Sequence, residues 1–304
     1  MKSGDIEATL LYSSEGPPEE AYDYDVVEEE KKFIGGLCTA DEPHRFLISN
    51  VRYIKEKPDL FLDGFHYVEN DEVKGLENCK VEKDYRAICN AAAERLVKDH
   101  VGAVATYTML AKYRTKTRVL GIHLDASPHD FENRMRWILN GKNSLEFDVG
   151  RLKELKNYLQ DDNHKFVIIQ VWRPLEKNLK DPFAVCSMSS VTIEEEAIVV
   201  RSQGLKPCGC ALWKYKPWHR WYYMEHQMPN EPILFIQHIG ETGQCLKDKV
   251  KTPTPIYAIP HTAFEDERYG QEKSRHSIET TVIAILHKDN PNLKRLESGE
   301  GGKF

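Results

Sequence analysis

The sequence predicts a mainly β fold with flanking helices, in which short strands form a barrel, a sandwich or a jelly roll. Three observations favour this class. From residue 166 onward, short runs rich in β-branched and aromatic residues alternate with Pro, Gly, Asn and Lys turn signals. The runs recur at near-regular spacing, which is typical of closed or double-sheet β architectures. The sequence contains no internal repeat, no G-x-G-x-x-G motif and no P-loop.

We expect helices in the first half of the chain and strands in the second. The Ala-rich segment Tyr85–Val101 carries apolar residues at helical spacing, and two more helices are predicted at Asp130–Leu139 and Val149–Leu159. Residues 13–32, rich in Pro, Glu and Tyr, are expected to form an exposed, extended arm. The predicted strands are Val119–Leu124, Phe166–Val171, Phe183–Cys186, Ala197–Val200, Ala211–Tyr215, Arg220–Met224, Ile233–Ile239, Tyr257–Ile259 and Thr280–Leu286.

The predicted organisation is a single domain over residues 1–304. Residues 1–118 are expected to form an N-terminal α/β annex packed on the core. The core then spans residues 119–290 and contains a helical insertion at about residues 129–160.

Composition narrows the classes of partner. The 304 residues carry a net charge of −6, which argues against a nucleic-acid or anionic-membrane partner. The partner we expect is a small-molecule substrate, for the reasons given below. No apolar run approaches the roughly 20 residues that span a bilayer, and the N-terminus lacks an apolar signal core. Seven scattered cysteines indicate reduced thiols, so we expect a cytoplasmic protein. The sequence leaves the oligomeric state open.

A candidate iron site begins at the end of the run Val119–Leu124. His123 and Asp125 are two residues apart, so in a strand both side chains project from one face. His261, after the strand-like run Tyr257–Ile259, can supply the second imidazole. Two histidines and one carboxylate form the metal-binding face of non-haem iron(II) oxygenases, which leaves coordination positions open for a cosubstrate and dioxygen.

Chance accounts for an H-x-D as readily as function does in a chain with 12 histidines. A second example, His287-Lys288-Asp289, precedes Asn290-Pro291 and has no histidine after it, so we interpret it as a solvated turn. His261 alone is also compatible with a core histidine bonded to the backbone.

Arg275 and Ser277 strengthen the iron interpretation. They form the only Arg-x-Ser in the chain, 14 residues after His261, and we expect them to share one face of the final strand. A guanidinium is a two-pronged clamp for a carboxylate, which matches the distal carboxylate of 2-oxoglutarate. Arg173 is the rival: if Trp172 faces inward, Arg173 faces outward, and the alternation decides between the two arginines.

Several strings of the sequence resemble a known family. They are Gly121–Ser127 (GIHLDAS), Val171–Leu175 (VWRPL), Asp181–Cys186 (DPFAVC), Arg220–Tyr223 (RWYY), Pro260–Phe264 (PHTAF) and Asp63–Phe65 (DGF). They resemble the hydroxylase/desaturase proteins of fungal natural-product clusters, whose relatives include bacterial proteins associated with cephamycin methoxylation.

The resemblance implies a double-stranded β-helix, the cupin-like jelly roll, and an iron(II)/2-oxoglutarate oxygenase of secondary metabolism. Its cofactors are Fe(II), 2-oxoglutarate and O2. The metal role falls on His123, Asp125 and His261, and the cosubstrate role on Arg275 and Ser277.

The chain departs from the family at Ser187–Ser190 and at Ala105–Thr108, which puts the identity of the substrate in doubt. We expect Tyr107, Trp172, Ser187 and Met188 to line the substrate pocket. Hydroxylation, desaturation and oxidative ring formation all remain open. So do a cupin-type isomerase or dioxygenase that does not use 2-oxoglutarate, and a binding module without catalytic activity.

Overall fold

The computed structural model describes residues 4–13, 40–115, 118–126, 128–141, 148–201, 209–248 and 259–297, and within them the strands form two sheets. The eight-stranded sheet has the order β1 (Ile6–Ser13), β2 (Ala40–Asn50), β10 (Trp221–Tyr223), β7 (Phe183–Cys186), β12 (His261–Ala263), β5 (His123–Leu124), β9 (Gly209–Trp213) and β8 (Ala197–Arg201). The five-stranded sheet has the order β3 (Phe65–Tyr67), β11 (Ile233–Glu241), β6 (His164–Pro174), β13 (Ser277–His287) and β4 (Ala105–Arg114).

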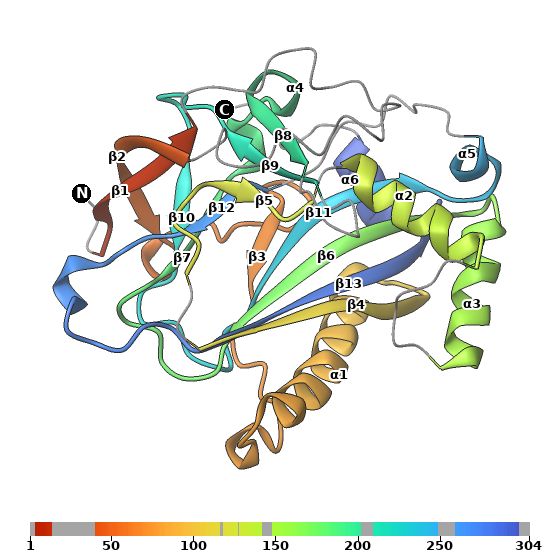
Figure 1. The fold of residues 1–304 in the computed structure, drawn as a ribbon, viewed down its shortest axis with the longest axis horizontal. Helices are drawn as coiled ribbons and strands as arrows, with labels where there is room; N and C mark the ends of the chain where they lie inside the picture. Colours follow the sequence, from red (N-terminus) through yellow and green to blue (C-terminus); the bar gives the residue numbers. More distant parts are fainter. Residues whose placement is uncertain are drawn as a thin grey trace.

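The helices lie outside the two sheets. They are α1 (Glu82–Val101), α2 (Pro128–Leu139), α3 (Val149–Gln160), α4 (Ile193–Glu196), α5 (Gly243–Lys247) and α6 (Pro291–Glu297), with short 3₁₀ turns at Val51–Tyr53, Leu76–Asn78, Met188–Ser190 and Glu267–Tyr269. Figure 1 shows α1 beneath β4 and β13, and α2, α3 and α5 together at one end. None of the helices in the described ranges is both long and apolar enough to cross a membrane.

Alternation along the strands gives the five-stranded sheet two different faces. On β6, Val167, Ile169 and Val171 pack in one cluster with Leu96 and Val97 of α1. The residues between them therefore point the other way, toward the eight-stranded sheet.

The inner faces of the two sheets pack against each other. Trp172 of β6 stacks on Phe183 of β7 with ring centroids 5.0 Å apart, and Phe235 of β11 lies 4.9 Å from the ring of His261 on β12. Side chains from both sheets thus fill one interior. The predicted mainly β fold with flanking helices, a double-sheet jelly-roll arrangement, is confirmed.

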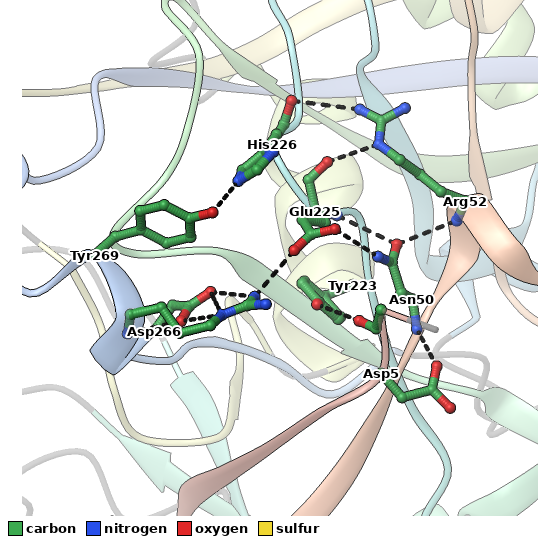
Figure 2. Close-up of polar contacts among 10 residues, drawn as sticks. Asp5, Asn50, Arg52, Tyr223, Glu225, His226, Asp266 and Tyr269 are labelled. Atoms are coloured by element: carbon green, nitrogen blue, oxygen red, sulfur yellow. Dashed lines mark hydrogen bonds and ion pairs between the residues drawn. The ribbon is translucent and has the colours of Figure 1, made fainter. Parts of the chain in front are cut away.

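The segment after β10 is fixed by a polar cluster (Figure 2). The guanidinium of Arg52 donates to the carbonyl oxygens of Glu225 (2.7 Å) and His226 (3.3 Å) and pairs with Glu231. The Asn50 side-chain oxygen accepts the backbone N–H groups of Arg52 and Glu225. These contacts hold the turn that leads into β11.

The three predicted helices are confirmed with small shifts at their ends. Strands β1 to β4 were not predicted, and most of the arm expected at residues 13–32 lies outside the described residues, with Ser13 ending β1. The run Val119–Leu124 contributes only β5 and a bridge from Gly121 to Leu11. Of the strand expected at Tyr257–Ile259, residues 257 and 258 lie outside the described residues, and β12 begins at His261.

Strands from before residue 118 pair with later ones. β2 pairs with β10 in the eight-stranded sheet, and β4 pairs with β13 in the five-stranded sheet. The division into an annex over residues 1–118 and a core over residues 119–290 therefore stays a prediction about folding units.

Candidate metal centre

Two neighbouring strands bring the three predicted metal ligands together. β5 and β12 are antiparallel, and their register places His123 directly opposite His261, with ring centroids 4.4 Å apart. Asp125 follows β5. One ligand atom from each residue lies within 4.8 Å of the other two. Since metal bonds to nitrogen and oxygen are about 2.0–2.2 Å long, small side-chain rotations suffice to bring all three onto one ion.

Backbone carbonyls fix the same tautomer in both imidazoles. Nδ1 of His123 lies 2.8 Å from the Gly121 oxygen, and Nδ1 of His261 lies 2.9 Å from the Ile259 oxygen. A carbonyl only accepts hydrogen bonds, so each Nδ1 carries the proton and each Nε2 keeps a lone pair. Such carbonyl contacts orient metal-binding histidines in proteins.

Both oxygens of Asp125 are held by donors from the five-stranded sheet. Lys112 of β4 donates to Oδ1 at 2.6 Å, and the side-chain amide of Gln170 on β6 donates to Oδ2 at 2.7 Å. Burial raises the pKa of Asp125, but the charged and hydrogen-bonding groups around it, among them the Lys112 ammonium, outweigh burial and hold that pKa well below its usual range. Asp125 is therefore a carboxylate at neutral pH.

The donor set fits a divalent metal ion. Burial, and to a lesser extent the neighbouring His261, lowers the pKa of His123 to about 3, so this imidazole is neutral. Nε2 of His261 is buried, lies 3.4 Å from Asp125 Oδ2, and has no hydrogen-bond partner among the described residues. Buried polar atoms without partners are uncommon, and here the atom faces a carboxylate and a second imidazole.

Glu279 lies behind Asp125 and was not found from the sequence. Gln170 also donates to Glu279, and Lys112 lies 3.5 Å from its Oε1. Burial and the adjacent Asp125 carboxylate raise the pKa of Glu279. Alternation along the last strand could have identified Glu279, because it is two residues from Ser277 and therefore shares its inward face.

Arg275 is a buried cation whose guanidinium nitrogens are largely unpaired. It is 4% exposed, and its Nε and Nη1 have no hydrogen-bond partner in the described part of the chain. Its guanidinium carbon lies 5.7 Å from the Trp172 ring centre and 6.0 Å from that of Phe183. Burial lowers the pKa of Arg275 to about 10, so the group stays charged at neutral pH. A buried charge is stable only when paired, so the space next to the Arg275 guanidinium favours the binding of an anion.

Ser277 and Trp172 surround the same place. Within the described ranges, the Ser277 hydroxyl and the Trp172 indole nitrogen are likewise buried without partners. β13 begins at Ser277, so Arg275 precedes the final strand instead of lying in it.

Arg173, the rival arginine, lies on the opposite face of β6. It ion-pairs with Asp71 and donates to the carbonyl oxygen of Pro229 at 2.5 Å. The alternation thus places Trp172 inward and Arg173 outward, where its charge is already satisfied.

The four residues expected at the substrate pocket lie in different surroundings. Trp172 borders Arg275, and Tyr107 packs with Phe166 and Ile168 near the helical end. The Ser187 hydroxyl contacts Asp63 at 3.3 Å, and the backbone N–H of Met188 donates to the Asp63 carbonyl. No described contact joins Ser187 or Met188 to the three metal ligands, and their substrate role stays a prediction.

Two packed sheets with a two-histidine, one-carboxylate cluster between them are the arrangement found in mononuclear non-haem metal enzymes. The chain belongs to the family described as "Oxidoreductase/YMDC permease-like domain", whose model matches residues 10–285.

Proteins with similar sequences carry related names. The hydroxylase/desaturase efuI of Hormonema carpetanum is 25% identical over 56% of this chain and 53% of its own length. Oxidoreductase AN1597 of Emericella nidulans is 23% identical over 86% of this chain and 93% of its own length. In the first three such matches the chain spans 53%, 41% and 58% of the relative, about half its length. The predicted resemblance to fungal hydroxylase/desaturase proteins is confirmed.

A solved structure shares the fold. The iron and alpha-ketoglutarate-dependent endoperoxidase NvfI superposes with a TM-score of 0.69 at 18% identity, covering 93% of this chain and 99% of that one. At this identity the likeness shows the fold alone.

Proposed function

We propose that this protein is an iron(II)/2-oxoglutarate-dependent oxygenase that acts on a small-molecule secondary metabolite. The observation that carries the proposal is the charged, largely unpaired guanidinium of Arg275, buried in the same interior as the His123, Asp125 and His261 cluster. A two-histidine, one-carboxylate metal face explains the cluster, and a metal-chelating cosubstrate with a carboxylate tail explains the arginine.

Each residue has a defined part in this proposal. His123, Asp125 and His261 would hold the iron, while Lys112 and Gln170 keep the Asp125 carboxylate oriented. Iron with 2-oxoglutarate and dioxygen supplies the oxidation of an unactivated C–H bond.

The proposed binding place of the cosubstrate tail lies beside Arg275, Ser277 and Trp172. Arg275 and Ser277 would receive the distal carboxylate of 2-oxoglutarate, and the ring of Trp172 excludes water from that charge pair. The names of similar proteins include hydroxylase, desaturase and endoperoxidase, and this breadth supports an oxidation without selecting its outcome.

An anaerobic titration tests the proposal directly. Purified protein under argon receives Fe(II) and then 2-oxoglutarate, and the weak visible charge-transfer band of the chelate is recorded. We expect a saturable band at one iron per chain, lost in His261→Ala. The matched control is His287→Ala, which alters the other H-x-D of the chain and should leave the band unchanged.

The opposite results would exclude this function. Metal binding without a 2-oxoglutarate band would favour a cupin-type enzyme that does not use the cosubstrate. Absence of metal binding would favour a binding module. A positive titration is followed by a screen of small metabolites for substrate-stimulated succinate release, which identifies the reaction.

A further inference from the structure

Strand β11 contains a bulge that turns two neighbouring side chains toward the interior. Its pairing with β6 slips between Ile236, opposite Ile169, and His238, opposite Ile168. Ile236 and Ile239 both pack in the cluster against α1, so they face outward. Gln237 and His238 lie between them and face the opposite side, as two residues of a bulge opposite one partner do.

Both side chains are buried and unsatisfied. Gln237 is 0% exposed and His238 is 4% exposed. Neither the amide oxygen and nitrogen of Gln237 nor the two ring nitrogens of His238 have a hydrogen-bond partner among the described residues. The nearest ionic group is Glu132 of α2, whose Oε1 is 3.8 Å from His238 Nε2, beyond hydrogen-bond length.

The bulge lies next to the metal cluster, on the side away from Arg275. Phe235, whose ring is 4.9 Å from that of His261, precedes Gln237 by two residues, or roughly 7 Å along a strand. On β6 the order of inward residues is Trp172 near Arg275, then Gln170 on Asp125, then Ile168 opposite the bulge. Along β6, the unsatisfied side chains of the Gln237–His238 bulge and of Arg275 thus lie on opposite sides of the contact with the metal ligand Asp125.

Aromatic rings flank the imidazole of His238 on the interior side of the bulge. The His238 ring stacks with Phe131 of α2 (6.0 Å) and lies 5.6 Å from Phe166. Burial lowers the pKa of His238 to about 3, with the nearby Arg136 acting in the same direction, so the imidazole is neutral at physiological pH. A primary amide and a neutral imidazole each offer one donor and one acceptor function without net charge.

We propose that Gln237 and His238 are the polar recognition site for a carbonyl or hydroxyl group on an otherwise apolar small-molecule substrate. The inference rests on the proposed oxygenase function and assigns the substrate class and its orientation. The cosubstrate tail binds at the cationic Arg275 end, and the uncharged oxygen of the substrate binds at the bulge. A molecule anchored there spans the region beside the metal, so that a C–H bond a few ångströms from its oxygen function is presented for oxidation.

The first test uses stability in the absence of any substrate. Gln237→Met replaces an unsatisfied amide by an apolar side chain of similar length, which should raise the melting temperature by about 2–4 °C. The matched control is Gln170→Met, which removes an amide bonded to Asp125 and Glu279 and should lower it. A fall in melting temperature for Gln237→Met as large as in the control would mean that a structural water or another partner satisfies Gln237, and would overturn the proposal.

The second test uses a matched pair of probes. The protein is loaded with Mn(II) and 2-oxoglutarate, and binding of camphor is compared with that of its analogue bearing a methylene group in place of the carbonyl oxygen. Relaxation of probe protons by Mn(II) reports binding beside the metal. We expect camphor to bind at least about 10-fold more tightly, in line with one hydrogen bond gained in a buried site.

The variant carrying Gln237→Met and His238→Phe should bind both probes equally and retain its affinities for Mn(II) and 2-oxoglutarate within about 2-fold. Equal binding of the probes by the unaltered protein, or a preference for camphor that survives in the variant, would overturn the inference. Failure of the unaltered protein to bind Mn(II) and 2-oxoglutarate would instead overturn the proposed function.

Discussion

Replacing Arg275 by alanine is the most direct perturbation of the proposed cosubstrate site. A hydrogen bond between charged groups contributes about 1.5–3 kcal/mol, and each 1.4 kcal/mol corresponds to a factor of about ten in affinity. Because Nε and Nη1 of Arg275 have no partner among the described residues, most of its pairing energy is available to the ligand. We expect the 2-oxoglutarate concentration at half-saturation to rise by about 10-fold to 100-fold.

Metal binding should survive the same substitution. None of the hydrogen bonds that hold His123, Asp125 or His261 involves Arg275. The charge-transfer titration therefore separates the two effects, since iron stoichiometry stays at one while the 2-oxoglutarate curve shifts. Arg275→Lys should recover only part of the affinity, because an ammonium cannot reproduce the planar fork of a guanidinium.

Arg173→Ala is the control, with the opposite expected pattern. Its guanidinium is 2% exposed and pairs with Asp71, which keeps its second partner Arg95 when Arg173 is removed. The free energy of unfolding should therefore fall by about 1–3 kcal/mol, the cost of losing a charged hydrogen bond in a buried place. Its 2-oxoglutarate affinity should stay within about 2-fold, measured where the variant is folded. If Arg173→Ala loses 2-oxoglutarate and Arg275→Ala does not, the assignment of the clamp is wrong.

Two further predictions follow from the interior network. Gln170→Leu removes the donor to Asp125 Oδ2 and should weaken Co(II) or Fe(II) binding by about 10-fold to 100-fold, because the contacts behind a metal ligand keep it oriented. Calorimetric titration measures the metal affinity. An unchanged affinity would mean that Lys112 alone orients the carboxylate. The second prediction concerns pH. The pKa of His238 is about 3 in the folded state and near 6.5 ordinarily, so the unfolded state binds more protons as the pH falls. Stability therefore decreases as the pH drops below about 6.5 toward 3. Between pH 8 and pH 5, the protonation of His238 lowers the free energy of unfolding by about 2 kcal/mol. His238→Phe should remove this part of the acid-induced loss, as measured by urea unfolding at the two pH values. An unaltered difference in the free energy of unfolding between pH 8 and pH 5 would contradict the prediction.

The candidate metal ligands and Arg275 were predicted from the sequence because a spacing of two residues relates His123 to Asp125 and Arg275 to Ser277, and because His261 follows a strand-like run. His123 and Asp125 share a face by their spacing, and the same alternation separates Trp172 from Arg173. Once the strands are located in the sequence, the face to which each of these side chains points follows, without knowing which strands pair with each other.

The polar groups around the ligands could not be read in this way. Lys112, Gln170 and Glu279 come from three strands that are far apart in the sequence, and they meet only because β4, β13 and β6 are neighbours in one sheet. Strands β1 and β2 were missed for a related reason. Their residues are stabilised by pairing with each other and with β10, whereas their local composition is mixed and partly charged. The bulge at Gln237 depends on the register between β11 and β6, which no local pattern of the sequence specifies.

The distribution of satisfied and unsatisfied polar groups in the interior itself argues for two different ligands. Asp125 and Gln170, which must keep a fixed orientation before any ligand arrives, are fully hydrogen bonded to the protein. Among the described residues, the buried polar atoms without partners include Nε and Nη1 of Arg275 on one side of the metal cluster and the side chains of Gln237 and His238 on the other. An unpaired buried group lowers stability, so each such group calls for an explanation, and a bound ligand is the one proposed for these residues. Arg275 carries a positive charge, whereas the side chains of Gln237 and His238 are uncharged, so the first favours an anion and the second pair an uncharged polar group. Under the two proposals, a charged cosubstrate and an apolar substrate bearing a single oxygen function would therefore reach the metal from opposite sides, without competing for the same contacts.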